Sequence, residues 1–122
     1  MAKWALGLRA SAATDAAVEE AFTRGEFLRT HVLRPTWHFV SPADLRWMLA
    51  LTGPRLIERL ALRYRELELD PQTLSLGLSV FSRALEGGKQ ATREELGLAL
   101  RAARIDPGGQ RLPHLLMYGE LR

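Results

Sequence analysis

Three helix-start signals divide this chain of 122 residues and constrain what it can fold into. The pairs Ser-Pro at 41–42 and Asp-Pro at 70–71 each place a capping side chain before a proline suited to the first helical position. Thr92 and Glu95 have the spacing of a capping box. Apolar residues at helical spacing follow each signal, so we expect a mainly α protein.

The predicted helices begin at these signals and end at glycine or proline. A first helix is expected over residues 14–23, capped by Thr14 or Asp15 and ended by Gly25. The helix that starts at 41–42 is expected to stop at Gly53-Pro54, because proline disrupts the preceding helical turn. The apolar faces expected for the later helices are Leu56, Leu60, Tyr64 and Leu67, then Leu74, Leu78, Phe81 and Leu85, then Leu96, Ala99, Leu100 and Ala103.

Residues 27–40 differ from the rest of the chain, because they are rich in β-branched and aromatic side chains. Their only proline, Pro35, lies in the middle, where it suits a turn better than a paired strand. We therefore predict one β-hairpin with its turn at residues 33–35.

The C-terminal end, from 89 to 122, has a helix-turn-helix pattern, with the turn at "IDPGG". In the last helix Arg111, His114 and Tyr118 share one face and could contact bases or phosphates. Pro113 requires this helix to begin near Arg111 or Leu112, or to be kinked. The residues expected to point inward are Leu112, Leu115, Leu116 and Leu121.

The charge of the chain is mildly positive, at +3, and rests on 15 arginines and two lysines. Arginine suits bidentate phosphate contacts, although a bias in codon usage explains the same composition equally well. Since no apolar run reaches the roughly 18 residues of a membrane span, we expect no membrane partner and a cytoplasmic location. There is no cysteine, so disulfides and thiolate metal sites are excluded.

Candidate catalytic and metal-binding residues are few. His31 and His38 lie on opposite strands of the predicted hairpin and could be neighbours, but a third ligand is missing nearby. We expect no metal and no cofactor, since phosphate-loop and nucleophile-elbow motifs are also absent. Trp37, Phe39 and Trp47 are predicted to be core residues, whereas Trp4 is expected to be partly exposed.

Two long stretches, "FLRTHVLRPTWHFVSPADLRWMLALTGPR" (27–55) and "TREELGLALRAARIDPGGQRLPHLLMYGELR" (92–122), resemble one family. It is the winged helix DNA-binding domain family of bacterial and archaeal proteins, which includes the AlkZ/YcaQ-type DNA glycosylases. The resemblance covers about residues 3–122. Its most specific part is "RPTWH" at 34–38 followed by the helix cap "SPADL" at 41–45.

The resemblance implies a winged-helix-like fold in three parts. Residues 1–40 would be the tail of a first winged helix with the hairpin as its wing, 41–88 linking helices, and 89–122 the helix-turn-helix of a second unit, all in one body. Members of the family are usually longer, so we expect an internal or truncated piece. Glycosylase members carry a Gln-x-Gln motif, and Gln72, Gln90 and Gln110 do not have that spacing. Glycosylase activity is therefore not expected of this chain alone.

The leading prediction is a module that binds double-stranded DNA and is related to DNA-repair glycosylases. The alternatives are a helical interaction or structural domain without DNA contact, and a dimeric transcription regulator. Weak self-association through exposed apolar faces is also expected. The row at Arg55, Arg59 and Arg63 could equally be a solvated face paired with nearby glutamates. The predicted DNA-binding residues are Arg34, Thr36, His38, Arg55, Arg59, Arg63, Arg111, His114 and Tyr118.

Overall fold

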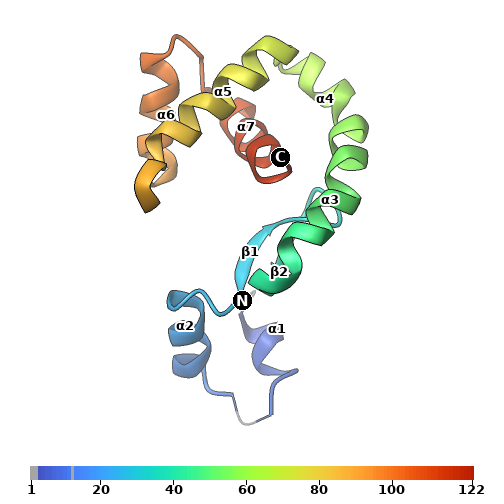
Figure 1. The fold of residues 1–122 in the computed structure, drawn as a ribbon, viewed down its shortest axis with the longest axis vertical. Coiled ribbons are helices and arrows are strands. Elements are labelled where there is room, and N and C mark those ends of the chain that lie inside the picture. Colours follow the sequence, from blue (N-terminus) through green and yellow to red (C-terminus); the bar gives the residue numbers. More distant parts are fainter. Residues whose placement is uncertain (1–2, 12) are drawn as a thin grey trace.

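The computed structural model describes residues 3–11 and 13–122 (Figure 1). It is mainly helical with one antiparallel β-hairpin, which confirms the predicted fold class and is consistent with a winged-helix-like fold. The elements are α1 (Trp4–Gly7), α2 (Asp15–Thr23), β1 (Leu28–His31), β2 (Trp37–Val40), α3 (Pro42–Arg59), α4 (Ala61–Glu66), α5 (Pro71–Ala84), η1 (Glu86–Gly88), α6 (Arg93–Ala102) and α7 (Arg111–Glu120).

The predicted helix starts are confirmed at atomic detail. The side chains of Thr14, Ser41 and Asp70 each accept a hydrogen bond from an amide two or three residues later. Thr92 and Glu95 form both bonds of the capping box. These contacts satisfy amides that have no partner within the first helical turn, so the local sequence fixes where four helices begin.

The prediction that Gly53-Pro54 ends a helix is wrong, because α3 runs through this pair to Arg59. Gly53 is buried, and a Cβ atom built on it would lie 2.6 Å from the carbonyl oxygen of Leu121. Leu56, one turn further along, packs with Leu121 and Met117. Packing against the end of α7 thus holds α3 helical at the position where proline alone favours a break.

The helices α3, α4 and α5 follow one another in an arc, and α7 lies on the inner side of that arc (Figure 1). The break between α3 and α4 falls at Leu60. Helix α7 begins at Arg111, which places Pro113 in its first turn, where its missing amide costs no helical bond. All described side chains of α7 are buried or half-buried. The last helix is therefore a central packing element.

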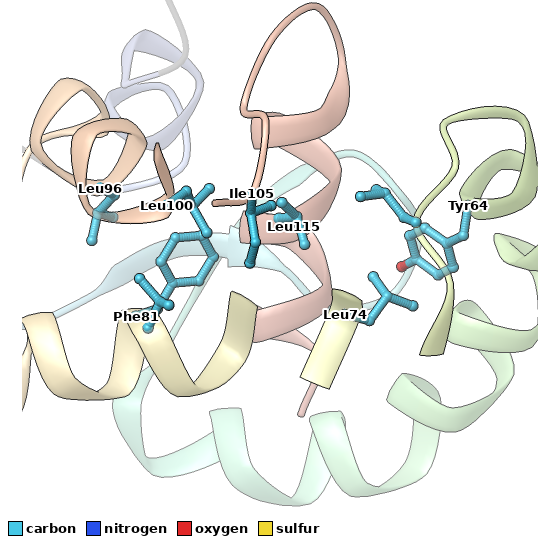
Figure 2. Packing of buried hydrophobic residues seen from close by; sticks show 9 residues of the cluster. Tyr64, Leu74, Phe81, Leu96, Leu100, Ile105 and Leu115 are labelled. Atoms are coloured by element: carbon cyan, nitrogen blue, oxygen red, sulfur yellow. The ribbon is translucent and has the colours of Figure 1, made fainter. Parts of the chain in front are cut away.

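The main hydrophobic core joins α4, α5, α6 and α7 (Figure 2). Leu100 and Leu115 are fully enclosed at its centre, and Phe81 packs beside them from α5. Gly77 lets α5 approach α7 closely, since a Cβ atom there would lie 2.9 Å from the side chain of Leu115. The residues predicted on the inward faces of these helices are buried or half-buried, except for Leu85. Leu85, at the end of α5, is 40% exposed, so its predicted inward position is wrong.

The hairpin pairs β1 with β2, and its register places His31 opposite Trp37 and Thr30 opposite His38. Because neighbouring residues of a strand point to opposite faces, His31 and His38 lie on different faces of the hairpin. The expectation that the two histidines could be cross-strand neighbours is therefore wrong.

The core positions predicted for two tryptophans are also wrong. Trp37 is 41% exposed and Trp47 is 56% exposed. In α3 the Trp47 indole lies on the outer surface and donates a hydrogen bond to Asp44, 2.8 Å away. Phe39 does pack, against Phe22 and Phe27, and Trp4 is exposed as expected. Aromatic character alone did not decide which side of an element faces the core.

Candidate nucleic-acid interface

Trp37 lies at the start of β2 with basic side chains around its ring. The guanidinium of Arg29 lies over the indole at 4.9 Å from the ring centre, and that of Arg93 at 6.0 Å. Arg29 comes from β1 and Arg93 from the start of α6, so the fold brings together residues that are far apart in sequence. Cations at these distances are attracted by the electron-rich face of the indole.

The turn of the hairpin extends this cluster. Arg34 and Thr36 are exposed in the segment between β1 and β2. Within residues 3–11 and 13–122, no carboxylate lies within ion-pairing distance of Arg29, Arg34 or Arg93. We call Arg29, Arg34, Thr36, Trp37 and Arg93 the hairpin patch.

The end of the hairpin next to its turn is anchored to α7 by Glu120. Its Oε2 accepts hydrogen bonds from the Thr30 hydroxyl at 2.9 Å and the His31 amide at 3.0 Å. The Nδ1 atom of His31 lies 2.7 Å from the same oxygen. The His31 ring in turn packs on Trp37, with ring centres 4.1 Å apart. A carboxylate near the C-terminus thus fixes the orientation of the ring that supports the patch.

A second anchor joins the turn to α3. The Thr52 hydroxyl lies within hydrogen-bonding distance of the Val32 carbonyl and of the Met48 carbonyl one turn earlier in α3. Val32 is fully buried. The chain that leads to the exposed Arg34 is therefore held by both α7 and α3.

His38 lies apart from the hairpin patch. It is on β2 but faces the side of the hairpin opposite to Trp37. Its Nδ1 atom is buried and has no hydrogen-bond partner in the described part of the chain. Two of the three predicted hairpin residues, Arg34 and Thr36, thus belong to the patch and the third does not.

The predicted arginine row is divided between two helices. Arg55 and Arg59 are exposed on α3, whereas Arg63 is on α4, beyond the break at Leu60. Arg63 also pairs with Glu66 at 2.9 Å. The three guanidiniums therefore do not form a single row on one continuous helix.

The predicted face of the last helix points toward α4. Tyr118 and His114 lie edge to face with Tyr64, with ring centres 5.9 and 6.5 Å apart. The Arg111 guanidinium donates to the carbonyls of Leu67 and, at 3.3 Å, Glu68. This face joins α7 to the end of α4 in the structure.

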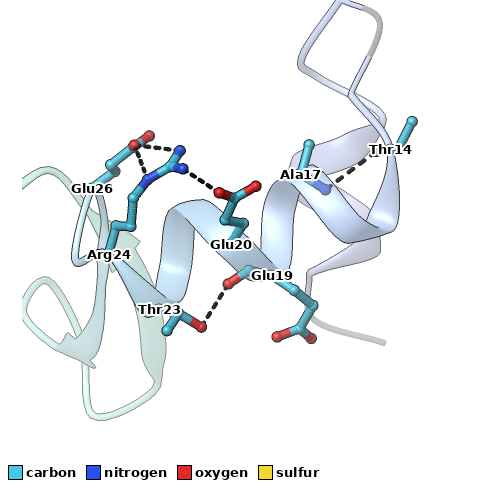
Figure 3. Close-up of polar contacts among 7 residues, drawn as sticks. All are labelled: Thr14, Ala17, Glu19, Glu20, Thr23, Arg24 and Glu26. Atoms are coloured by element: carbon cyan, nitrogen blue, oxygen red, sulfur yellow. Dashed lines mark hydrogen bonds and ion pairs between the residues drawn. The ribbon is translucent and has the colours of Figure 1, made fainter.

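Arg24, in contrast to the patch arginines, is paired with carboxylates that are near it in the sequence. Figure 3 shows Arg24 at the end of α2 between Glu20 and Glu26, with nitrogen–oxygen distances of 2.6 and 2.7 Å. Such exposed pairs add little stability, but they leave less positive charge for a polyanion. Arg24 therefore contrasts with the arginines of the hairpin patch.

No group of three or more histidine, aspartate or glutamate side chains is placed to hold a metal ion in 3–11 and 13–122. Over the same residues, every helix is too short or too polar to cross a bilayer.

The sequence of the chain matches a known protein family. The model of the DNA glycosylase AlkZ-like family matches residues 1–122, the full length of the chain. The chain belongs to the AlkZ-like family. Curated proteins gave no match, and neither did solved structures. Membership links this AlkZ-like chain to DNA repair and implies interaction with DNA.

Sequence reasoning missed three residues that shape the interface of the AlkZ-like chain. Arg29 and Arg93 lie on Trp37, and Glu120 holds His31 from 89 residues away. Because Arg29 is charged and side chains alternate between the two faces of a strand, the sequence could have indicated which face of the hairpin Arg29 occupies. Nothing in the local sequence could have paired Arg93 or Glu120 with the hairpin, because those contacts depend on the tertiary fold.

Proposed function

We propose that this AlkZ-like chain binds double-stranded DNA and that the hairpin patch contacts the DNA backbone. The observation that carries the proposal is the half-exposed Trp37 with two guanidiniums on its ring. An aromatic ring holds a stacked guanidinium in one orientation, and a guanidinium loses its hydration with a small free-energy penalty. Both properties favour contacts with phosphate groups. Family membership makes DNA the expected polyanion.

The hairpin is well suited to act as a wing. Its strands are four residues long, and its turn carries the exposed side chains of Arg34 and Thr36. The anchors at Glu120 and Thr52 hold the turn end of the hairpin, so little ordering of the backbone is required on binding. We infer a wing that lies over the phosphates or the minor groove, without base reading in the major groove.

The remaining predicted residues contribute unequally to this proposal. Arg55 and Arg59 are exposed and can add phosphate contacts from α3. Base reading by Arg111, His114 and Tyr118 stays a prediction, and it would require the contacts between α7 and α4 to open. His38 would have to act from the opposite face of the hairpin.

We propose further that the chain alone does not cleave the N-glycosidic bond. Base excision needs a group that activates water beside an extruded base. The three glutamines, Gln72, Gln90 and Gln110, are too far apart in sequence to form a Gln-x-Gln motif. An assay of base release from alkylated duplex DNA tests this point, and turnover by the purified chain would contradict it.

Substitution within the patch tests DNA binding directly. We expect the double variant Arg34→Ala/Trp37→Ala to bind a fluorescein-labelled duplex about 10-fold or more weakly than the unmodified chain, measured by fluorescence anisotropy. Arg24→Ala is the matched control, because it removes one arginine that is already ion-paired. Equal affinities of the double variant and the control would overturn the proposal.

A further inference from the structure

A groove of about 690 Å³ lies between the end of α3, α4, the start of α5 and α7. Its aromatic wall consists of Tyr64 and Tyr118, which lie edge to face with ring centres 5.9 Å apart. Leu69 and Leu74 provide apolar surface beside them. The volume falls within the range of about 300–1,000 Å³ typical of small-molecule sites. None of these residues belongs to the hairpin patch.

The hydroxyl of Tyr64 is a buried polar group without a partner beside this groove. Tyr64 is only 4% exposed, and no group among residues 3–11 and 13–122 hydrogen-bonds to its hydroxyl oxygen. In Figure 2 the hydroxyl points away from α4 and toward Leu74. Burial and the neighbouring Tyr118 raise the pKa of Tyr64 to about 12, so the hydroxyl stays protonated at neutral pH.

An unpaired buried hydroxyl costs stability, and phenylalanine would fill the same space without that cost. Packing in the free protein therefore does not explain why this side chain is a tyrosine. A ligand in the groove that hydrogen-bonds to the hydroxyl would explain it.

The charged side chains that line the groove are mostly acidic, and the Arg111 guanidinium, outside the lining, is near enough to Asp70 to lower its pKa. Glu58, Glu68 and Asp70 line it together with a single basic residue, Arg65. The Thr73 amide and hydroxyl lower the pKa of Asp70, so that carboxylate is ionised at neutral pH. Within the described residues, neither Glu58 nor Glu68 pairs with a basic side chain. A positive ligand is therefore favoured over a neutral or a negative one.

We propose that this groove binds a small planar aromatic cation that carries an N–H group. The tyrosine rings and the leucines contact its flat faces, and Glu58 and Glu68 attract its charge. The side chains that cover the Tyr64 hydroxyl move when the ligand enters, and the hydroxyl oxygen then accepts the N–H of the ligand. The ligand is a free molecule and not a base within a DNA strand, because flanking phosphates would meet three carboxylates. This site is independent of the DNA-binding proposal.

Two acridines that share the same rings provide the test. The probe is 9-aminoacridine, a cation at pH 7.5, and acridine, which is uncharged at that pH, is its control. Calorimetric titration of the full chain, freed of nucleic acid, is expected to show binding of the cation at least 10-fold tighter than that of acridine. Equal affinities, or no binding of the cation, would overturn the proposal.

Three variants locate the site. Tyr64→Phe keeps the ring and is expected to weaken 9-aminoacridine binding about 3- to 10-fold, the range for one hydrogen bond. Glu58→Gln/Glu68→Gln should bring the affinity for the cation close to that for acridine. Glu86→Gln removes one exposed carboxylate in η1, outside the groove, and should bind like the unmodified chain.

Thermal melting of Tyr64→Phe without ligand separates binding from folding. We expect its Tm to be equal to or above that of the unmodified chain, because the substitution removes an unpaired buried hydroxyl. A lower Tm would mean that the hydroxyl already has a stabilising partner, which contradicts the proposal. Unchanged binding of 9-aminoacridine by Tyr64→Phe, or by the double glutamine variant, would contradict it as well.

Discussion

Asp70 shows how a single carboxylate fixes the start of a helix in this fold. Its Oδ1 accepts the Thr73 amide at 2.7 Å, and the hydrogen bonds from Thr73 hold the pKa of Asp70 below its ordinary value of 3.8. Glu95 is held in the same way by the amide and hydroxyl of Thr92, which lower its pKa. Both carboxylates bind the backbone in their charged form, which links the helix starts to pH.

Asp70→Asn is expected to make the fold less sensitive to acid. A carboxylate with a lowered folded-state pKa stabilises the fold above its unfolded pKa of 3.8, and this contribution is lost as the pH falls through the folded value. Asparagine also caps helices but does not titrate in this range. Melting curves between pH 7 and pH 2 should therefore show a smaller drop in Tm below about pH 4 for Asp70→Asn than for the unmodified chain. Parallel curves would contradict this role of Asp70.

The course of α3 through Gly53-Pro54 depends on its contact with the end of α7. A Cβ atom on Gly53 would lie 2.6 Å from a backbone oxygen of Leu121, which cannot move without shifting α7. Gly97, in α6, makes a useful comparison, because a Cβ atom there would lie 3.6 Å from the Leu112 side chain. Glycine is thus required at position 53, because the backbone of Leu121 lies too close for a side chain, whereas position 97 has room for alanine.

Gly53→Ala is therefore expected to lower the free energy of unfolding by about 1–3 kcal/mol, the usual cost of overpacking. Gly97→Ala should leave it unchanged or raise it by up to about 1 kcal/mol, since alanine favours the helix. Urea unfolding followed by circular dichroism measures both values. Equal effects of the two substitutions would show that the close approach of α3 to Leu121 does not matter for stability.

Local signals were enough to predict most elements, whereas long-range contacts decided the rest. The helix starts at Ser41 and Asp70 depend on hydrogen bonds within three residues, so the sequence predicts them well. The continuation of α3 through Pro54 depends on Leu121, 67 positions later. The exposure of Trp37 likewise depends on how the hairpin packs in the tertiary fold, and a single strand pattern does not contain that information.

Glu120 joins the hairpin to α7, two parts of the molecule that are far apart in the sequence. The chain near residue 30 and the chain near residue 120 meet at one carboxylate oxygen, which contacts Thr30 and His31. Side-chain burial limits solvent at this point, since His31 is only 6% exposed. The hairpin and the helical core should therefore unfold together, because this contact links them.

Glu120→Ala is expected to lower the free energy of unfolding by about 1.5–3 kcal/mol, the range for hydrogen bonds that involve a charged group. Amides of the hairpin should also lose protection from hydrogen exchange more than amides of α5. Glu20→Ala is the control, because it breaks an exposed pair with Arg24 worth about 0–1 kcal/mol. Equal losses in the two variants would mean that Glu120 does not couple the hairpin to the core.

At the scale of the whole molecule, DNA binding by the hairpin patch is tested most directly by its salt dependence. Each phosphate contact adds about 0.9 to the slope of log affinity against log salt for duplex DNA. Replacing the three patch arginines, Arg29, Arg34 and Arg93, with alanine should therefore reduce the magnitude of that slope by about 3. Arg24→Ala should leave the slope unchanged, since its guanidinium is ion-paired. A triple variant with the same slope as the unmodified chain would contradict the assignment of DNA binding to the hairpin patch.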